Sequence, residues 1–208
     1  MKPITWYKSN YFSDNDAYMA LSDIFYDLFN FLGPDIIIFD PYFIGPIQEH
    51  DATNALSMVF EDQRAFINAI GRYLFESDFT VKFTICGYPK RAKTQIIKDN
   101  SSVLTKLEDL YTRYPIYLNG IMPPKKLYPN FVDFVASNDE FHNRYYFSRD
   151  TSDGSSSLLK PIVVTNSIGN IKEVDIVPVN DELQCAMICS KYINLLSGAK
   201  SINEVLNG

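Results

Sequence analysis

A histidine and an arginine two residues apart, His142 and Arg144, are the residues whose types and spacing best suit chemistry. They lie in the stretch FHNRYYF, whose composition predicts a β-strand, and side chains two residues apart on a strand point to the same face. An imidazole nitrogen can attack phosphorus while a planar guanidinium holds the nonbridging oxygens, so the pair suggests metal-free phosphoryl chemistry. The structural alternative is a histidine hydrogen-bonded within a β-hairpin and an arginine paired with Asp139 or Glu140.

Other residues that could bind a metal or perform redox chemistry are scarce. The only histidines are His50 and His142, which disfavours a site with two or three histidines in one chain. The cysteines, Cys86, Cys185 and Cys189, form no CxxC pair, so neither a disulfide framework nor a zinc site is indicated. Cys185 and Cys189 share a helix face and are interpreted as core residues, and His50 as a loop histidine or a second acid/base. We expect no metal and no cofactor.

The elements that must position these residues follow from hydrophobic periodicity. Residues 16–32 have the three-and-four spacing of a helix, with Asp14 or Asp16 as N-cap, and residues 36–39 form a short β-branched run typical of a strand buried on both faces. Further helices are predicted within 55–76, around 103–114 and over 181–196. Further strands are predicted at 79–85, 116–118, 131–136, 142–147, 161–165 and 173–179, with those at 131–136 and 142–147 joined by a turn at 137–139.

Strands and helices alternate in the first half of the chain, and pairs of strands dominate the second half. This order predicts an α/β fold with a mixed, partly antiparallel sheet flanked by helices. The 208 residues are expected to form a single domain, with a helical N-terminal extension over about 1–33 and C-terminal helices over about 181–208.

The segment that carries His142 resembles the phospholipase D superfamily, whose pattern is His-x-Lys, an Asp a few residues later and then Gly-Ser-x-x-Asn. By this resemblance His142 is the nucleophile that forms a phosphohistidine, and Arg144 takes the place of the lysine. Arg149 stands where the Asp is expected, and Asp150 follows it. Residues 166–170, NSIGN, reproduce the Ser-x-x-Asn part with Ser167 and Asn170, and asparagine replaces the preceding glycine.

A second resemblance begins at the predicted strand 36–39. The run IIFDPYF is similar to the strand end that opens the phospholipase-D-like C-terminal domain of MIT-domain proteins, which has bacterial single-motif relatives. The order of elements in that family matches this chain over residues 36–179. Asp40 lies at the carboxyl end of the strand, where α/β sheets present functional side chains, and Asp40 or Asp150 is expected to orient His142. The alternative for Asp40 is a turn aspartate that accepts backbone hydrogen bonds.

Bulk composition limits the class of protein. With 19 Lys and Arg against 25 Asp and Glu the net charge is −6, which argues against a nonspecific nucleic-acid coat protein. Local basic residues, Lys90, Arg91 and Lys93, still offer a candidate ligand-binding loop together with Arg144. The N-terminal residues do not have the composition of a signal peptide, and no apolar run approaches the length of a membrane span, so a cytoplasmic location is expected.

Three functions are consistent with these observations. The first, implied by the resemblance, is a metal-independent phosphodiesterase or nuclease, with a role in bacterial anti-phage defence. Here His142 attacks, Arg144 holds the phosphate, and Ser167 and Asn170 stabilise the oxyanion. With one motif histidine per chain, this mechanism requires a homodimer that shares one cleft. The alternative is a catalytically degenerate binding or adaptor module for a phosphorylated ligand, nucleic acid or protein partner. A structural subunit of a larger assembly is a third possibility, suggested by the aromatic content.

Overall fold

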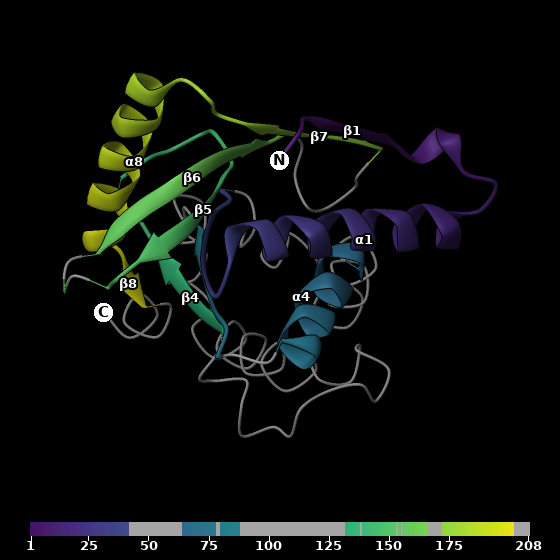
Figure 1. The fold of residues 1–208 in the computed structure, drawn as a ribbon, viewed down its shortest axis with the longest axis horizontal. Helices are drawn as coiled ribbons and strands as arrows, with labels where there is room; N and C mark the ends of the chain where they lie inside the picture. Colours follow the sequence, from purple (N-terminus) through teal and green to yellow (C-terminus); the bar gives the residue numbers. More distant parts are fainter. Residues whose placement is uncertain are drawn as a thin grey trace, which may run out of the picture.

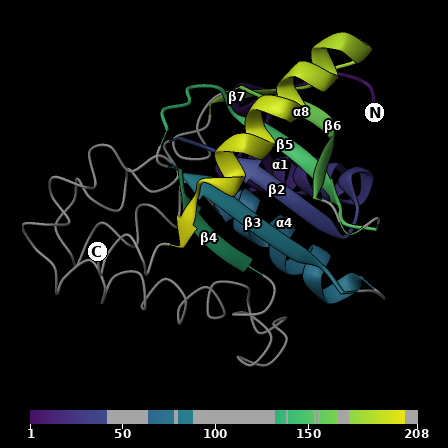
Figure 2. The same ribbon diagram turned by 90° about the vertical axis from the view of Figure 1, so that its left-hand side faces the viewer.

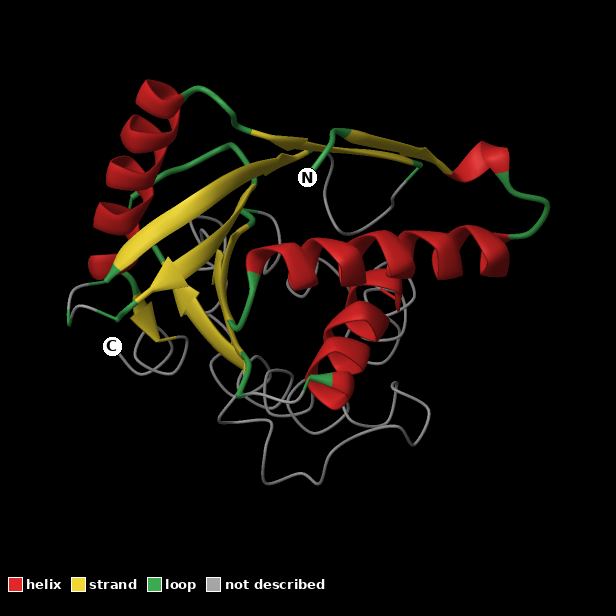
Figure 3. Cartoon of the chain, viewed as in Figure 1, coloured by secondary structure: helices red, strands yellow, loops and turns green. Residues whose placement is uncertain are grey.

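The computed structural model describes residues 1–41, 64–77, 80–87, 132–137, 139–152, 154, 156–165 and 172–201. The elements in chain order are β1 (Ile4–Tyr7), η1 (Lys8–Asn10), α1 (Asp14–Leu32), β2 (Asp35–Phe39), α4 (Arg64–Glu76), β3 (Lys82–Gly87), β4 (Val132–Ala136), β5 (Tyr145–Asp150), β6 (Ser157–Val164), β7 (Glu173–Pro178), α8 (Glu182–Ser197) and β8 (Lys200–Ser201). Figure 1 shows them as a ribbon and Figure 3 by type of secondary structure.

The described strands form one eight-stranded mixed sheet with the order β1-β7-β6-β5-β2-β3-β4-β8. β2, β3 and β4 run parallel, and all the other neighbouring pairs are antiparallel. The prediction of an α/β fold with a mixed, partly antiparallel sheet flanked by helices is confirmed. Figure 2 looks onto the face that α8 crosses, with β2 and β5 at the centre of the sheet.

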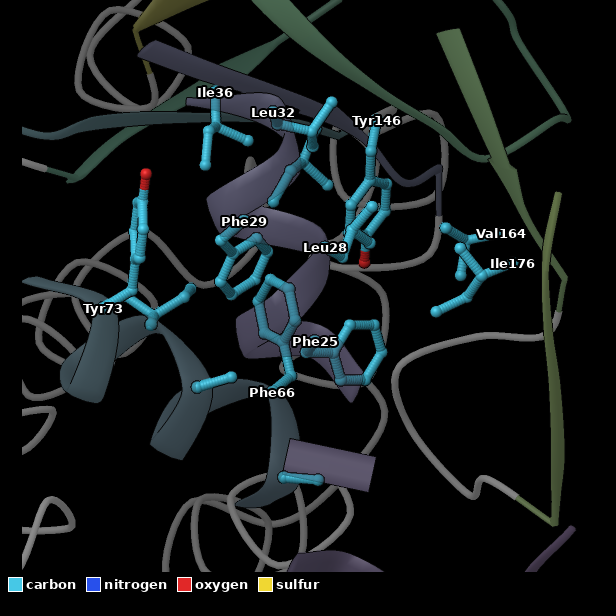
Figure 4. Packing of buried hydrophobic residues seen from close by; sticks show 14 of the residues in the cluster. Phe25, Leu28, Phe29, Leu32, Ile36, Phe66, Tyr73, Tyr146, Val164 and Ile176 are labelled. Atoms are coloured by element: carbon cyan, nitrogen blue, oxygen red, sulfur yellow. The ribbon is translucent and has the colours of Figure 1, made fainter. Parts of the chain in front are cut away.

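The helices divide between the two faces of the sheet. On one face α1 and α4 cover the even-numbered residues of β2, such as Ile36 and Ile38, and the aromatic rings of Phe25, Phe29 and Phe66 form the centre of this cluster (Figure 4). On the other face α8 covers the odd-numbered residues of the same strand, and Tyr192 contacts Phe39 with ring centroids 4.7 Å apart. Because β2 is covered on both sides, its continuous apolar run agrees with the expectation of a central strand.

Helix α1 begins two residues earlier than the apolar pattern indicated. Its N-cap is Ser13, whose hydroxyl oxygen accepts a hydrogen bond from the backbone N–H of Asp16. The predicted caps, Asp14 and Asp16, instead lie in the first turn, where their negative charges interact favourably with the helix dipole. The predicted cap was therefore wrong, because all four residues from 13 to 16 are good caps by type. The helix ends at Leu32, and its C-cap is Gly33, which has a φ of 95°.

Four expectations about the strands and the two chain ends are corrected. β4 and β5 do not form a hairpin, because β2 and β3 lie between them in the sheet. β5 instead pairs with β2 and β6, and it begins at Tyr145 rather than at residue 142. The N-terminal segment is also more than a helical extension, because β1 completes one edge of the sheet, and α8 is followed by a short strand, β8, rather than directly by another helix.

Several predictions fall on residues outside the described ranges. These are the helix around 103–114, the strand at 116–118, the turn at 167–170 and the basic loop at 90–93. Within the part of the chain that the structure describes, no helix is long and apolar enough to cross a bilayer.

Candidate functional site

The candidate site lies at the edge of the sheet where β2 ends and β5 begins. The carboxyl ends of the parallel strands β2 and β3 share this edge, and the backbone N–H of Asp40, directly after β2, donates to the carbonyl of Cys86 at 3.0 Å. β5 runs antiparallel to β2, so its N-terminal end reaches the same edge and brings Arg144 there. This is the edge at which open α/β sheets present functional side chains.

An ion pair joins these two strand ends. Arg144 Nε donates to Asp40 Oδ1 at 3.3 Å; the Asp40 side chain is completely buried, and that of Arg144 is 16% exposed. The last ladder pair of β2 and β5 is Phe39 with Tyr145, which makes Asp40 and Arg144 the next cross-strand pair. Alternation along the strands places both side chains on the face covered by α1 and α4. Asp40 therefore holds the guanidinium, and its expected role as the residue that orients His142 is not what the structure shows.

His142 lies before β5 and has a different partner. Its side chain is 73% exposed, and Nε2 is 3.5 Å from Oε1 of Glu140. β5 begins at Tyr145, so both residues lie before it, and the expectation that His142 and Arg144 belong to one strand is wrong. The structural alternative is partly supported: Glu140 contacts the histidine, whereas Arg144 pairs with Asp40 rather than with Asp139 or Glu140.

A buried tyrosine beneath the ion pair was missed by the sequence analysis. Tyr146 is completely buried in the α1 and α4 face against the rings of Phe25 and Phe66, and its hydroxyl has no hydrogen-bond partner among the described residues (Figure 4). Burial raises the pKa of the phenol well above its usual value; the Asp40 charge raises this pKa further, and the Arg144 charge lowers it. The sequence pattern of a strand does not reveal a buried, unpaired hydroxyl, because tyrosine is common in strands whether its hydroxyl is buried or exposed.

A second aspartate and arginine occupy the other end of the same strand pair. Arg149 Nε donates to Asp35 Oδ2 at 2.9 Å, with the two side chains 17% and 22% exposed. Arg149, which stands at the position of the Asp in the phospholipase D pattern, is therefore an ion-pair partner of Asp35 across the two strands. Asp150 lies at this far end of β5 too, where its carboxylate accepts the backbone N–H of Ser152. Asp150 and Arg144 are thus at opposite ends of the strand, and the expectation that Asp150 orients His142 is not supported.

The remaining predicted site residues lie outside the described ranges: Ser167, Asn170, Lys90, Arg91 and Lys93. Their roles stay predictions. Among the described residues there is no group of three or more His, Cys, Asp or Glu that could hold a metal ion. The residues that the structure brings together at the strand ends are Asp40, Arg144 and Tyr146, with His142 and Glu140 on the adjoining loop.

Comparison with known proteins gives no relative for this chain: no family model, no curated protein and no solved structure matches it. The function is therefore inferred from the geometry of the site and from the chemistry of its residues.

Proposed function

We propose that this chain is a phospholipase-D-like module that binds a phosphate group at the carboxyl edge of β2 without cleaving it. The observation that carries the proposal is the ion pair between Arg144 and Asp40. A buried carboxylate fixes the orientation of the guanidinium, and a guanidinium that is already oriented loses less side-chain freedom when it binds an anion. Asp40 is buried, so an approaching phosphate would meet Arg144 rather than the carboxylate.

The placement of His142 favours binding over cleavage. A phosphohistidine mechanism needs the nucleophile and the cation to converge on one phosphorus atom in a site that excludes water. His142 is 73% exposed and contacts Glu140, whereas Arg144 is held inward by Asp40. The two side chains therefore have separate carboxylate partners in this structure. An exposed imidazole suits a second hydrogen bond to a bound phosphate better than it suits covalent catalysis.

One observation favours the catalytic alternative. Glu140 lies 3.5 Å from Nε2 of His142, and a carboxylate beside an imidazole can set its tautomer and support its role as a nucleophile or base. In this alternative the chain is a metal-independent phosphodiesterase, and a second His142 must come from another copy of the chain to protonate the leaving group.

One experiment separates binding from cleavage. The purified chain and His142→Ala are incubated in EDTA with labelled single- and double-stranded DNA and RNA and with a soluble glycerophosphodiester, and both retention and product are measured. We expect retention of at least one probe by both proteins, with no product from either. Cleavage in EDTA that His142→Ala abolishes would establish the enzyme instead. Failure of every probe to bind would overturn the phosphate-binding proposal.

A further inference from the structure

The outer edge of β1 carries backbone groups that can form hydrogen bonds with the same edge of a second copy of the chain. β1 is the terminal strand of the sheet, with β7 on one side of it and no described strand on the other (Figure 1). The backbone N–H of Lys8 donates to Lys172 at 2.8 Å, which fixes the alternation of hydrogen-bonding directions along β1. The N–H of Lys8 and both backbone groups of Trp6 and Ile4 therefore point towards β7, while the Lys8 carbonyl accepts the N–H of Tyr11 in η1. Thr5 and Tyr7 direct their backbone groups away from β7.

The donors and acceptors that point outward differ from residue to residue along this edge. Thr5 offers both an N–H and a C=O, and neither has a partner among the described residues. Tyr7 offers its N–H, but Tyr7 is the N-cap of η1, so its carbonyl already accepts the first hydrogen bond of that turn. By the same alternation Pro3 directs its carbonyl outward, and a proline has no N–H to donate.

We propose that two copies of this chain associate through β1, antiparallel about a twofold axis at Thr5. In this register the two Thr5 residues exchange a pair of hydrogen bonds. The Tyr7 N–H of each copy donates to the Pro3 carbonyl of the other. The missing N–H of Pro3 thus lies opposite the occupied carbonyl of Tyr7, and every outward group named above is satisfied. Such a self-complementary contact is what a twofold interface requires.

The side chains on both faces of β1 agree with this register. On the solvent-facing side, Thr5 meets its own copy, and the exposed Tyr7 ring meets Pro3. On the core side, Trp6 meets the partly buried Ile4, which would extend the apolar cluster under α1 across the contact. The one like-charged pair is Lys8 with Lys2, and Lys8 Nζ is compensated by Asp14 at 3.0 Å within its own chain.

This dimer would keep the two candidate sites apart. β7, β6 and then β5 follow β1 in the sheet, so seven strand spacings separate β5 from the β5 of the second copy. At about 4.8 Å per spacing the two strands are roughly 30 Å apart. The two His142 residues therefore cannot share one cleft in this assembly. The interface is independent of the proposed phosphate site, and it conflicts with the two-histidine arrangement that cleavage would need.

The test is the mass of the chain in solution, measured by light scattering and by sedimentation over a wide range of concentration. We expect the wild-type chain to approach twice its 23.8 kDa mass as its concentration rises. Thr5→Pro removes one outward N–H without removing a bond to β7, and it should leave a monomer. Thr5→Ala keeps that N–H and is the matched control, which should still dimerise.

A second variant tests the same contact in case Thr5→Pro does not fold. Thr5→Lys keeps every backbone group but sets two like charges opposite each other on the twofold axis, so it should also weaken the dimer. Trp6 is the single tryptophan, and its buried emission spectrum reports whether β1 remains folded in each variant. A wild-type chain that stays monomeric at every concentration would overturn the proposal. So would a dimer that survives in folded Thr5→Pro and Thr5→Lys.

Discussion

Asp40 and Arg144 are cross-strand neighbours one position beyond the ladder of β2 and β5, joined at 3.3 Å. Asp35 and Arg149 form the corresponding pair at the other end of the ladder, at 2.9 Å. The four ladder pairs between them are thus bounded by two ion pairs, which lie on opposite faces of the sheet by strand alternation. Each pair favours one register of β2 and β5, because a slip of one residue would separate the opposite charges.

Loss of Arg144 should cost more stability than loss of Arg149. Asp40 is completely buried, so Arg144→Ala leaves a buried carboxylate without this cation, and we expect a cost of about 3 to 5 kcal/mol. Asp35 is 22% exposed and keeps partial contact with water, although its Oδ1 is buried, so Arg149→Ala should cost less, about 1 to 2 kcal/mol. Urea denaturation of the two variants measures the difference. Equal costs would show that burial does not distinguish the two pairs.

Removal of the Tyr146 hydroxyl should not destabilise the fold. The oxygen is buried and has no hydrogen-bond partner among the described residues, so folding desolvates it without compensation. Tyr146→Phe keeps the aromatic packing against Phe25, and we expect a gain of about 1 kcal/mol in the free energy of unfolding. The same denaturation experiment tests this prediction, and a clear loss of stability would show that the hydroxyl has a partner after all.

Stability should fall in alkaline solution partly because of Tyr73. Burial raises the pKa of Tyr73 from 10.0 to about 12, and its hydroxyl donates to the carbonyl of Gly33 at 2.9 Å. Above the unfolded pKa the unfolded chain releases this proton while the folded chain keeps it, so the free energy of unfolding decreases as the pH rises from about 10 to about 12. Tyr73→Phe should make the decrease shallower over that interval, as measured by urea midpoints. An unchanged slope would contradict the assignment.

The three thiols should react at different rates with an aromatic disulfide reagent. Burial raises the pKa of Cys86 to about 12, and this thiol lies inside the sheet, so its reaction should wait for unfolding. Cys185 and Cys189 are partly exposed on α8, and burial raises the pKa of Cys189. We therefore expect Cys185 to react first, Cys189 next and Cys86 last. Mass spectrometry of the labelled peptides measures this order. Rapid labelling of Cys86 in the folded chain would be inconsistent with this structure.

The elements with strong periodicity could be predicted from the sequence. α1 and the buried strand β2 follow from apolar spacing, since α1 buries a continuous stripe and β2 a continuous run. α8 was also predicted, although only Tyr192 and Leu195 of it are buried. β1 was missed because it is only four residues long and its surroundings are polar. The neighbours of β4 and β5 were also missed, because strand order depends on long-range pairing that a local turn signal does not encode.

The candidate site could be predicted only in part. Asp40 was expected at a strand end, and it is there because a Pro follows it and ends β2. Its partner was expected to be His142, but the antiparallel register of β2 and β5 brings Arg144 to it instead. That register is set by the whole ladder, so the spacing of His142 and Arg144 alone could not reveal it.

The most direct test of the proposed phosphate site compares two arginines of equal burial. Arg144 and Arg149 are 16% and 17% exposed, and each pairs with an aspartate across the same strand pair, but only Arg144 lies at the carboxyl edge of β2. Arg144→Lys and Arg149→Lys both keep the charge, and the affinity of each for a labelled oligonucleotide in EDTA is measured by fluorescence anisotropy. We predict that Arg144→Lys weakens binding by roughly tenfold, because lysine lacks the planar fork, and that Arg149→Lys leaves it unchanged. Equal affinities in the two variants would contradict a phosphate site at Arg144.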